Sequence, residues 1–484
     1  MNKIYTKSNK IIFFLILFSV FFWDLRVIPE RFIVNNQIYD KALSNLDSRF
    51  IYLLGIIPII FSLRYILFKK IISFKFTIVS SISLFFFIIH QIFTSDNITL
   101  LELTYFIVIF ITLFVLKVYG GYFLDNKTLI IHSVSILSVF FYVFSLIIFD
   151  FLEIRNNDGE LLKWNRFSFE PCRSGFYNNY NFVFSESSHF AMIAISIFLT
   201  NFYLIIEKNF KDIKLIISFV IFSFVVFNNM SLTMIVGIIL CQLALIIVNL
   251  RKTSLKYILS SFLMLVFFVV TLLNFSECKN KTKNAMWLVK QKIPFLKIYT
   301  DNLNLELQKK EETKEEDQFS YSLSVNTSKG EKFVKNFKIK KTTDLSSAVL
   351  AHNLRVVENS IFSKPLGWGL NRYSNAFEYY TKYQIDEINH TYAIYVNNED
   401  GSLNFTKIIV EYGLFSLFLV IIYTIFIFSK NISLSDKALL FPIIFTQVFL
   451  RGAGYFNGGF LIATILIIFI IFNLYERKIS EKSY

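Results

Sequence analysis

The chain has 484 residues, of which 55% are hydrophobic and only 17% are charged, and its formal net charge is +14. The apolar residues come in blocks, and a soluble domain with such blocks would carry large apolar surface patches, so the soluble globular class is excluded. The basic residues are dispersed along the whole chain, which argues against nucleic-acid binding. Composition therefore indicates a polytopic integral membrane protein.

Stretches that can cross a bilayer recur from one end of the chain to the other. A spanning helix needs roughly 20 mostly apolar residues, because each residue advances ~1.5 Å through ~30 Å of hydrocarbon. Stretches of this kind begin near Ile11, Phe50, Phe76, Ile98, Leu129, Ser188, Leu215, Ser231, Tyr257, Phe405, Ala438 and Tyr455. The sequence therefore predicts an all-α polytopic membrane protein with about twelve transmembrane helices. No small-residue cleavage site follows the first stretch, which predicts an uncleaved signal anchor.

Lysine and arginine residues beside these stretches predict the orientation of the chain. Alternation of the spans puts most of them on one side: Lys3, Lys7, Lys10, Lys69, Lys70, Lys117, Lys127, Lys208, Lys211, Lys214, Arg251, Lys252, Lys256, Lys430, Lys437, Arg477, Lys478 and Lys482. The positive-inside rule makes that side cytoplasmic. Arg26, Arg31 and Lys41 fall on the opposite side, so the bias is incomplete. Both termini are expected in the cytoplasm.

Two outward segments are longer than the ~2–8 residues of ordinary helix connections. A medium loop covers residues 151–186, and a large loop covers residues 276–403. The chain thus divides into residues 1–275 with about nine spans, the large loop, and residues 404–484 with about three spans. In the large loop, the Lys- and Glu-rich run from Lys309 to Asp317 predicts a solvated segment without a catalytic role. The mixture of aromatic, glycine and arginine residues from Ala351 to Tyr380 instead suits a folded substrate pocket.

The cysteines and the known cofactor motifs add little. Cys172 and Cys278 both lie in outward loops, where a disulfide is permitted, and Cys241 lies in a span. The pairing of the first two stays open from sequence alone. No metal-ligand spacing, P-loop or dinucleotide fingerprint is present, so neither a metal nor a cofactor is expected.

Several short motifs follow one another over the C-terminal two thirds of the chain. They are RSGFY (Arg173–Tyr177), SESSHFA (Ser185–Ala191), NNMSLTMIVG (Asn228–Gly237), Arg355, PLGWGLNRY (Pro365–Tyr373), NFTKIIVEYGLFSL (Asn404–Leu417) and RGAGYF (Arg451–Phe456). Their order, with the large outward loop before the last few spans, resembles the O-antigen polymerase (Wzy-type) family, which is related to the O-antigen ligases. Ser187 stands where the family usually has proline.

The resemblance implies a metal-independent glycosyltransferase of the bacterial inner membrane, with both loops in the periplasm. Its substrates would be polyprenyl-diphosphate-linked oligosaccharides, and a chain-length regulator and a flippase would be its partners besides the lipid bilayer. Three tasks follow: a cation must stabilise the departing diphosphate, a base must take the proton of the acceptor hydroxyl, and a platform must hold sugar rings. Arginine suits the first task, because its planar fork binds phosphate oxygens bidentately.

Four arginines are candidates for the diphosphate and the substrate. Arg355 is the preferred cation, although it could instead pair with a loop carboxylate such as Glu358. Arg372 either contacts substrate or keeps the loop soluble. Arg173 and Arg451 could each contact phosphate or lipid headgroups.

Glu186 is the preferred base, because entry into the membrane tends to raise the pKa of a carboxyl group. It could equally cap the following helix. His189 lies three residues later and could share a proton network with Glu186, or could be a buried structural histidine. Glu411, near the outer end of its span, either binds substrate or pairs with an arginine of another helix.

Trp368 stands between Gly367 and Gly369, where it could stack on a sugar ring or anchor the loop to headgroups. Three further ionisable residues, His90, Glu102 and His132, lie at or within spans without an assigned role.

Ligase and transporter are the two alternatives to the polymerase function. Ligases carry a His-Asn pair shortly before the glycine of the re-entry helix, and the matching positions before Gly413 are Ser402 and Leu403. A rival register uses His390 and Thr391 with Gly401, which lies in a polar loop and does not enter a span. A transporter would show internal repeats with broken helices, and none is found. The sequence therefore favours polymerase over ligase.

Overall fold

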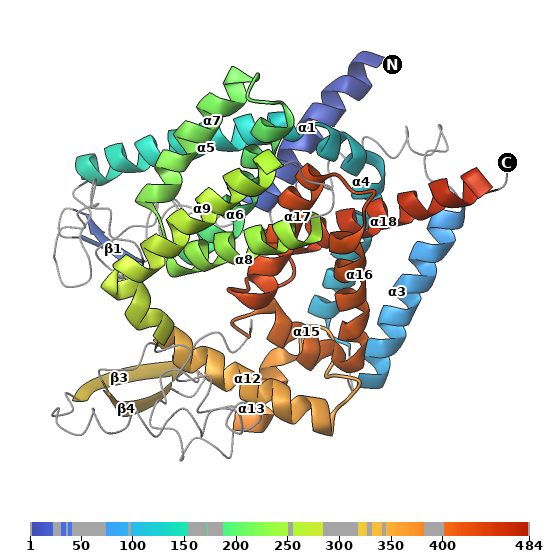
Figure 1. Cartoon of the computed structure of the whole chain (residues 1–484). Helices are drawn as coiled ribbons and strands as arrows, with labels where there is room; N and C mark the ends of the chain where they lie inside the picture. The colour runs from blue at the N-terminus through green and yellow to red at the C-terminus, as the bar shows by residue number, and fades with distance from the viewer. Residues whose placement is uncertain are drawn as a thin grey trace, which may run out of the picture. The chain divides into compact units, whose positions relative to one another are not determined.

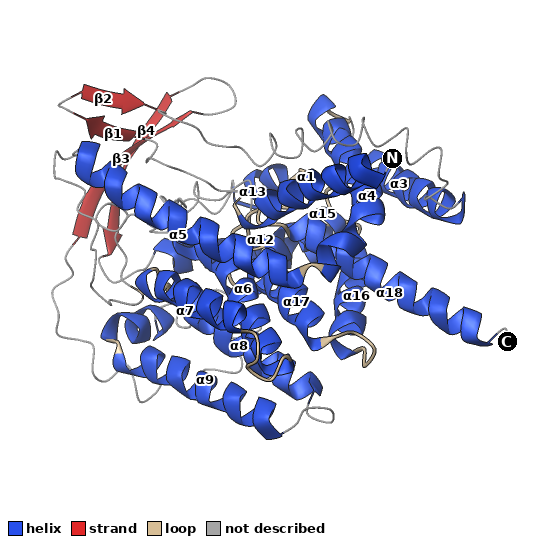
Figure 2. Ribbon diagram, turned by 90° about the horizontal axis from the view of Figure 1, so that it is seen from above, coloured by secondary structure: helices blue, strands red, loops and turns tan. Residues whose placement is uncertain are grey.

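The computed structural model describes residues 2–22, 31–34, 37–40, 74–94, 98–152, 172, 187–249, 255–283, 318–326, 332–340, 345–381 and 401–482 (Figures 1 and 2). The chain divides into two compact units. The larger unit consists of Met1–Ile89, Ile98–Phe275 and Phe418–Tyr484, and the smaller consists of His90–Asn97 and Ser276–Leu417.

Helices make up nearly all of the described part of the larger unit. They are α1 (Asn2–Phe21), most of α3 (Phe74–Thr94), α4 (Leu100–Asp125), α5 (Lys127–Leu152), α6 (Ser187–Glu207), α7 (Ile213–Asn228), α8 (Leu232–Asn249), α9 (Leu255–Asn274), most of α16 (Ser416–Phe428), α17 (Leu434–Phe449) and α18 (Phe460–Lys482). Helix α6 is buried along most of its length and packs against α7, α8 and α17 (Figure 1). Helix α5 packs against α7, and α18 packs against α4 and α17.

Hydrogen bonds of the larger unit explain two of the ionisable residues that lacked a role. The Thr99 hydroxyl accepts a hydrogen bond from the Glu102 N–H, and the Glu102 carboxylate accepts one from the Thr99 N–H at 2.9 Å. This reciprocal pair is a capping box that fixes the start of α4. His132 Nδ1 lies 2.6 Å from the Ser218 hydroxyl and thereby links α5 to α7.

The described helices fit the predicted membrane protein, although fewer of them are long and apolar enough to span a bilayer than the sequence predicts. Four are long and apolar enough to cross a membrane: Leu100–Asp125, Lys127–Phe144, Ser188–Glu207 and Asn404–Phe428. The bent pair Ile258–Asn274 and Ser276–Lys283 makes a fifth if it is one span, and five further helices are apolar but shorter. The predicted span near Phe50 lies outside the described residues, and so does the medium loop, except for Cys172 and its first two residues, which are the last two of α5.

Two antiparallel β-hairpins accompany the helices and were not predicted from the sequence (Figure 2). Strands β1 (Arg31–Val34) and β2 (Gln37–Asp40) form the first hairpin, with Phe32 opposite Tyr39. Strands β3 (Gln318–Asn326) and β4 (Lys332–Lys340) form the second, with Phe319 opposite Ile339. The second hairpin begins directly after the charged run that ends at Asp317, so part of the large loop has regular structure.

Three helices form the centre of the smaller unit. Two belong to the large loop, and the third starts the next apolar segment. They are α12 (Leu345–Ser363), α13 (Tyr373–Thr381) and α15 (Asn404–Tyr412), and the short 3-10 helix η2 (Gly413–Phe415) follows α15. Their core contains the buried side chains of Val356, Val357, Tyr373, Ala376, Phe377 and Val410, with Trp368, Tyr380 and Ile409 packed against it. The region predicted to be a folded pocket, Ala351 to Tyr380, therefore forms a packed core together with α15.

Candidate functional site

The turn from Pro365 to Leu370, which we call the GWG turn, is bonded to the end of α15. The Trp368 N–H donates to the Val410 carbonyl and the Gly369 N–H donates to the Glu411 carbonyl, both at 2.9 Å. In return, the Leu414 N–H donates to the Pro365 carbonyl at 2.9 Å. The last four carbonyls of a helix lack partners within the helix. The GWG turn thus satisfies carbonyl groups that α15 itself leaves open.

Glycine is required where the GWG turn meets α15. Gly367 has a φ of +88°, and a Cβ there would lie 2.3 Å from the Glu411 carbonyl oxygen. Gly413 has a φ of +52°, and its Cβ would lie 2.0 Å from the Pro365 carbonyl oxygen. Side chains at these positions would clash with backbone atoms that cannot move aside. The two segments therefore pack more closely than any other residue type permits.

The C-terminal end of α3 holds the GWG turn from another direction. Gln91 is fully buried, and its side-chain amide makes two bonds to one residue. Its Oε1 accepts from the Leu370 N–H at 2.6 Å, and its Nε2 donates to the Leu370 carbonyl at 3.3 Å. His90 Nε2 lies 2.7 Å from the Leu366 carbonyl, and because a carbonyl only accepts, this nitrogen carries the proton. The His90 ring also stacks on Tyr412.

A buried ion pair lies within α15, the helix that the GWG turn bonds. Lys407 Nζ is 3.5 Å from Glu411 Oε1, and their side chains are 7% and 0% exposed. The same Glu411 oxygen accepts a hydrogen bond from the Tyr373 N–H at 3.2 Å. Glu411 therefore links α15 to the first residue of α13. The ion pair described for Glu411 is with a lysine one turn earlier in its own helix, and its predicted pairing with an arginine of another helix stays a prediction.

Tyr373 carries the polar contacts further into the smaller unit. Its hydroxyl donates to Asn353 Oδ1, and Asn353 Nδ2 donates to the Ser402 hydroxyl at 2.9 Å. Burial raises the pKa of Tyr373 far above its usual value, so the phenol stays protonated and remains a donor. Asn353 is fully buried, and both ends of its amide have a partner. The network connects α12, α13 and Ser402, which lies two residues before α15.

Trp368 has close neighbours on its ring. Lys364 Nζ lies 3.8 Å from the ring centroid, and the rings of Tyr379 and Tyr380 lie 5.5 Å and 5.8 Å away. The indole is partly buried in the core, and its Nε1 has no hydrogen-bond partner among the described residues. One face of the ring is therefore occupied by a lysine. Tyr379, which is 61% exposed, is the more accessible ring of this group.

The smaller unit brings together three of the eight predicted site residues. Arg372 follows the GWG turn, where its N–H donates to the Gly369 carbonyl at 3.3 Å, and Trp368 and Glu411 lie beside it in the same bonded framework. Arg355 lies on α12, two residues after Asn353, but its side chain is outside the described part. Glu186 and Arg173 also lie outside the described residues.

The other two predicted residues belong to the larger unit. His189 is in the first turn of α6 and is half-buried. Arg451 follows α17, and its N–H donates to the Thr446 carbonyl at 2.8 Å.

Three residues of the site were not predicted: Gln91, Asn353 and Lys407. Lys407 had a signal, because it precedes Glu411 by four residues and a lysine and a glutamate at that spacing share a helix face. No local sequence pattern marks Gln91 or Asn353. The hydrogen-bond partner of Gln91 lies 279 residues away in sequence.

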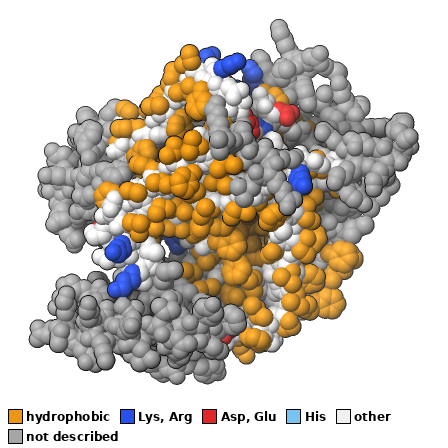
Figure 3. All heavy atoms as spheres, viewed as in Figure 1, with side chains coloured by type: hydrophobic (Ala, Val, Ile, Leu, Met, Phe, Trp, Pro, Cys, Tyr) orange, Lys and Arg blue, Asp and Glu red, His pale blue; other side chains and the backbone are white. Residues whose placement is uncertain are grey.

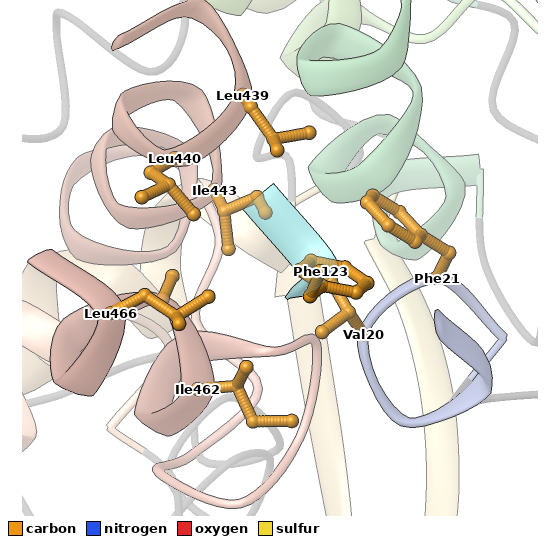
Figure 4. A pocket seen from close by; sticks show the side chains of 9 residues that line it. Val20, Phe21, Phe123, Leu439, Leu440, Ile443, Ile462 and Leu466 are labelled. Carbon is orange, nitrogen blue, oxygen red and sulfur yellow. The ribbon is translucent and has the colours of Figure 1, made fainter. Parts of the chain in front are cut away.

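The larger unit contains a small cavity of about 10 Å³ between α1, α4, α17 and α18, lined by apolar side chains that include Phe21, Phe123 and Leu466 (Figure 4). A cavity of this size admits about one water molecule at most. Among the described residues, no group of three or more His, Cys, Asp or Glu side chains could hold a metal ion. Cys172 and Cys278 are disulfide-bonded, and Cys241 is free.

Comparison with known proteins gives no relative: no family model, no curated protein and no solved structure matches the chain.

Proposed function

We propose that the chain is a polymerase of polyprenyl-diphosphate-linked oligosaccharide repeat units, which make O-antigen or a related surface polysaccharide. The observation that carries the proposal is the packing of PLGWGLNRY onto NFTKIIVEYGLFSL. These two segments carry much of the family resemblance, and they lie far apart in sequence. Three backbone hydrogen bonds, two glycines at positions that exclude a side chain, and the Tyr373–Glu411 bond join them into one framework. A framework held this closely can keep substrate-binding groups in a fixed geometry.

The proposed reaction transfers a glycan between two lipid-linked substrates. The acceptor is a sugar hydroxyl of one repeat unit, and its proton goes to a base, for which Glu186 is our candidate, with His189 three residues later in the sequence. The bond between the donor sugar and its polyprenyl diphosphate breaks as the new glycosidic bond forms. Arg355 would stabilise the departing diphosphate, and Arg372, Arg173 and Arg451 are further phosphate candidates. No metal ion takes part in this scheme.

The neighbours of Trp368 refine its proposed role. Because Lys364 covers one face of the indole, a sugar could stack only on the other face or on the exposed Tyr379 beside it. Glu411 is fully buried, so its proposed contribution is to position the GWG turn and α13 from behind. Arg372 lies between these groups in the sequence and is the residue of the turn region best suited to contact an anionic substrate.

The buried position of Ser402 favours polymerase over ligase. In ligases a histidine occupies the matching position and takes part in the chemistry. Ser402 and Leu403 are each 6% exposed, and the Ser402 hydroxyl accepts a hydrogen bond from Asn353. A serine hydroxyl that is buried and hydrogen-bonded in this way supplies neither a catalytic base nor a surface that a substrate can reach.

The proposed topology places about twelve spans in the bacterial inner membrane, both termini in the cytoplasm and residues 276–403 in the periplasm. Reporter fusions at Lys70 and Asn326 test it, because the two positions should report opposite compartments. Equal signals would contradict the topology.

Deletion of the gene and gel analysis of surface polysaccharide tests the proposed activity. A polymerase deletion should leave a product of core plus one repeat unit, because capping continues without chain growth. Complete loss of capped core would indicate a ligase, and an unchanged ladder would contradict both functions.

A further inference from the structure

The smaller unit exposes large apolar side chains from three elements around the GWG turn. They come from the end of α3, the end of α12 and the turn that follows it, and η2, and they are between 52% and 83% exposed. We call the following six residues the apolar rim: Ile92, Phe93, Phe362, Leu366, Leu414 and Phe415. Large exposed apolar side chains that gather on a protein surface mark an interaction site. Hydrophobic side chains also dominate the described surface visible in Figure 3.

Direct contacts tie these elements to one another. Leu414 donates its N–H to Pro365, the residue before Leu366. His90 Nε2 bonds the Leu366 carbonyl, and the His90 ring packs edge-on against Phe415 at 5.3 Å. The end of α3, the GWG turn and η2 therefore meet at one place.

The apolar rim is continuous with a segment that is long and apolar enough to cross a membrane. Leu414 and Phe415 belong to the candidate span Asn404–Phe428. Before the break at Gly413, α15 buries polar residues such as Lys407 and Glu411 inside the smaller unit. After the break, exposed apolar residues such as Leu417 and Phe418 follow. The surface of this span thus changes from protein-facing to exposed and apolar at Gly413.

The length of α16 sets how far a bilayer must extend. Its 13 residues advance about 20 Å, which is less than the ~30 Å hydrocarbon core. A hydrocarbon core that covers α16 along its length therefore extends beyond Ser416, toward Leu414 and Phe415, which precede it in the chain. The GWG turn tolerates contact with a bilayer, because the N–H groups of Gly367, Trp368, Gly369 and Leu370 are all hydrogen-bonded within the protein.

We infer that the apolar rim inserts into the surface of the bilayer, with lipid acyl chains as the partner of Phe362 and Leu366. Lys364 lies between these two residues and is exposed, so it is placed to contact lipid phosphates while Trp368 packs beneath it. Lysine and tryptophan side by side suit the boundary between acyl chains and headgroups. The GWG turn would then lie at the depth where a lipid-linked diphosphate presents its reactive bond. Only this last consequence rests on the proposed function.

Site-specific photocrosslinking in the full chain tests the inference. A benzophenone analogue of phenylalanine replaces Phe362, and the protein is reconstituted into vesicles of phosphatidylcholine and phosphatidylglycerol before illumination. The same analogue at Phe418, an exposed residue of α16, is the lipid-facing reference, and at Glu378, an exposed polar residue of α13, it is the water-facing control. Mass spectrometry then measures phospholipid adducts and crosslinks between chains.

The expected result is a phospholipid adduct at position 362 with a yield similar to that at 418, and a background yield at 378. The analogue stays aromatic at a position that is 83% exposed, so the fold should tolerate it. A background yield at 362 would overturn the inference. A crosslinked pair of chains at 362 in place of the lipid adduct would also overturn it, because a second copy would then cover the apolar rim. Neither outcome bears on whether the chain is a polymerase, which the deletion experiment decides separately.

Discussion

Gly367 and Gly413 lie backbone against backbone: a Cβ on Gly413 would lie 2.7 Å from the amide nitrogen of Gly367. Both residues have positive φ, so neither position suits an L side chain even without the contact. This approach lets the GWG turn bond the carbonyls of α15. The close contact therefore joins the large loop to the segment that follows it.

Gly413→Ala should destabilise the protein markedly. The positive φ alone costs about 1–3 kcal/mol for a residue with a side chain, and the clash with the Pro365 carbonyl adds to it. The unfolding midpoint of the purified protein in detergent should fall accordingly. Gly121→Ala is the control, because a Cβ at Gly121 meets nothing within 4 Å and alanine is favoured in the helix. Equal midpoints for the two variants would contradict the contact.

Lys407→Met should lower the stability of the protein more than removal of both charges does. The single change takes the Lys407 charge away from the buried Glu411 carboxylate, and breaking a buried ion pair in this way costs about 3–5 kcal/mol. Lys407→Met combined with Glu411→Gln should recover part of that loss, because a glutamine can still accept from the Tyr373 N–H. Thermal unfolding of the wild type, both single variants and the double variant gives the coupling between the two residues. Purely additive effects would show that the pair is not coupled.

Gln91→Leu should weaken the attachment of the GWG turn to α3. The leucine has a similar size but leaves the Leu370 N–H and carbonyl without their side-chain partner, at a cost of about 1–3 kcal/mol per unsatisfied group. Thr94→Val is the comparison, since the Thr94 hydroxyl donates to the His90 carbonyl within its own helix and makes no backbone bond to the turn. Limited proteolysis of the large loop should accelerate for Gln91→Leu only. Unchanged proteolysis would mean that the Gln91–Leu370 bonds contribute little.

The apolar helices, such as α4, α5 and α6, could be predicted from the sequence because length and hydropathy decide where an apolar helix forms, whereas α12 and α13 of the large loop were not predicted. The β3–β4 hairpin was also predictable: Phe319, Tyr321, Leu323 and Val325 alternate with polar residues, a period of two that is typical of a strand. The adjacent charged run, Lys309–Asp317, dominates the composition of that part of the loop and hides this pattern.

The hydrogen bonds that join the GWG turn to α15 were harder to predict from the sequence. PLGWGLNRY and the helix that contains Glu411 were both singled out, but nothing in either segment indicates that Trp368 and Gly369 bond the carbonyls of α15. Long-range backbone hydrogen bonds depend on which residues the whole fold brings together, and they leave no local pattern. The glycines of the two segments were a clue to the contact, since isolated glycines often mark a close approach of two backbone segments.

Arg355→Ala is the variant that tests the proposed chemistry most directly. If Arg355 binds the diphosphate, its loss leaves the developing negative charge unpaired, at a cost on the order of 3 kcal/mol or more. Because each ~1.4 kcal/mol changes a rate tenfold, polymer should fall roughly a hundredfold or more while the protein level stays normal. Polysaccharide ladders at matched expression measure this change.

Arg355→Lys and two lysine variants separate the phosphate contact from a general effect of charge. Lysine keeps the positive charge but lacks the planar fork that binds two oxygens, so Arg355→Lys should recover only part of the activity. Lys309→Ala and Lys310→Ala remove charges from the same loop in the solvated run and should give ladders of normal length. Two residues before Arg355, Asn353 anchors α12 in the buried network, so the backbone position of residue 355 is held even when its side chain changes. A wild-type ladder from Arg355→Ala would therefore mean that the diphosphate contact lies elsewhere, with Arg173 and Arg451 as the next residues to replace.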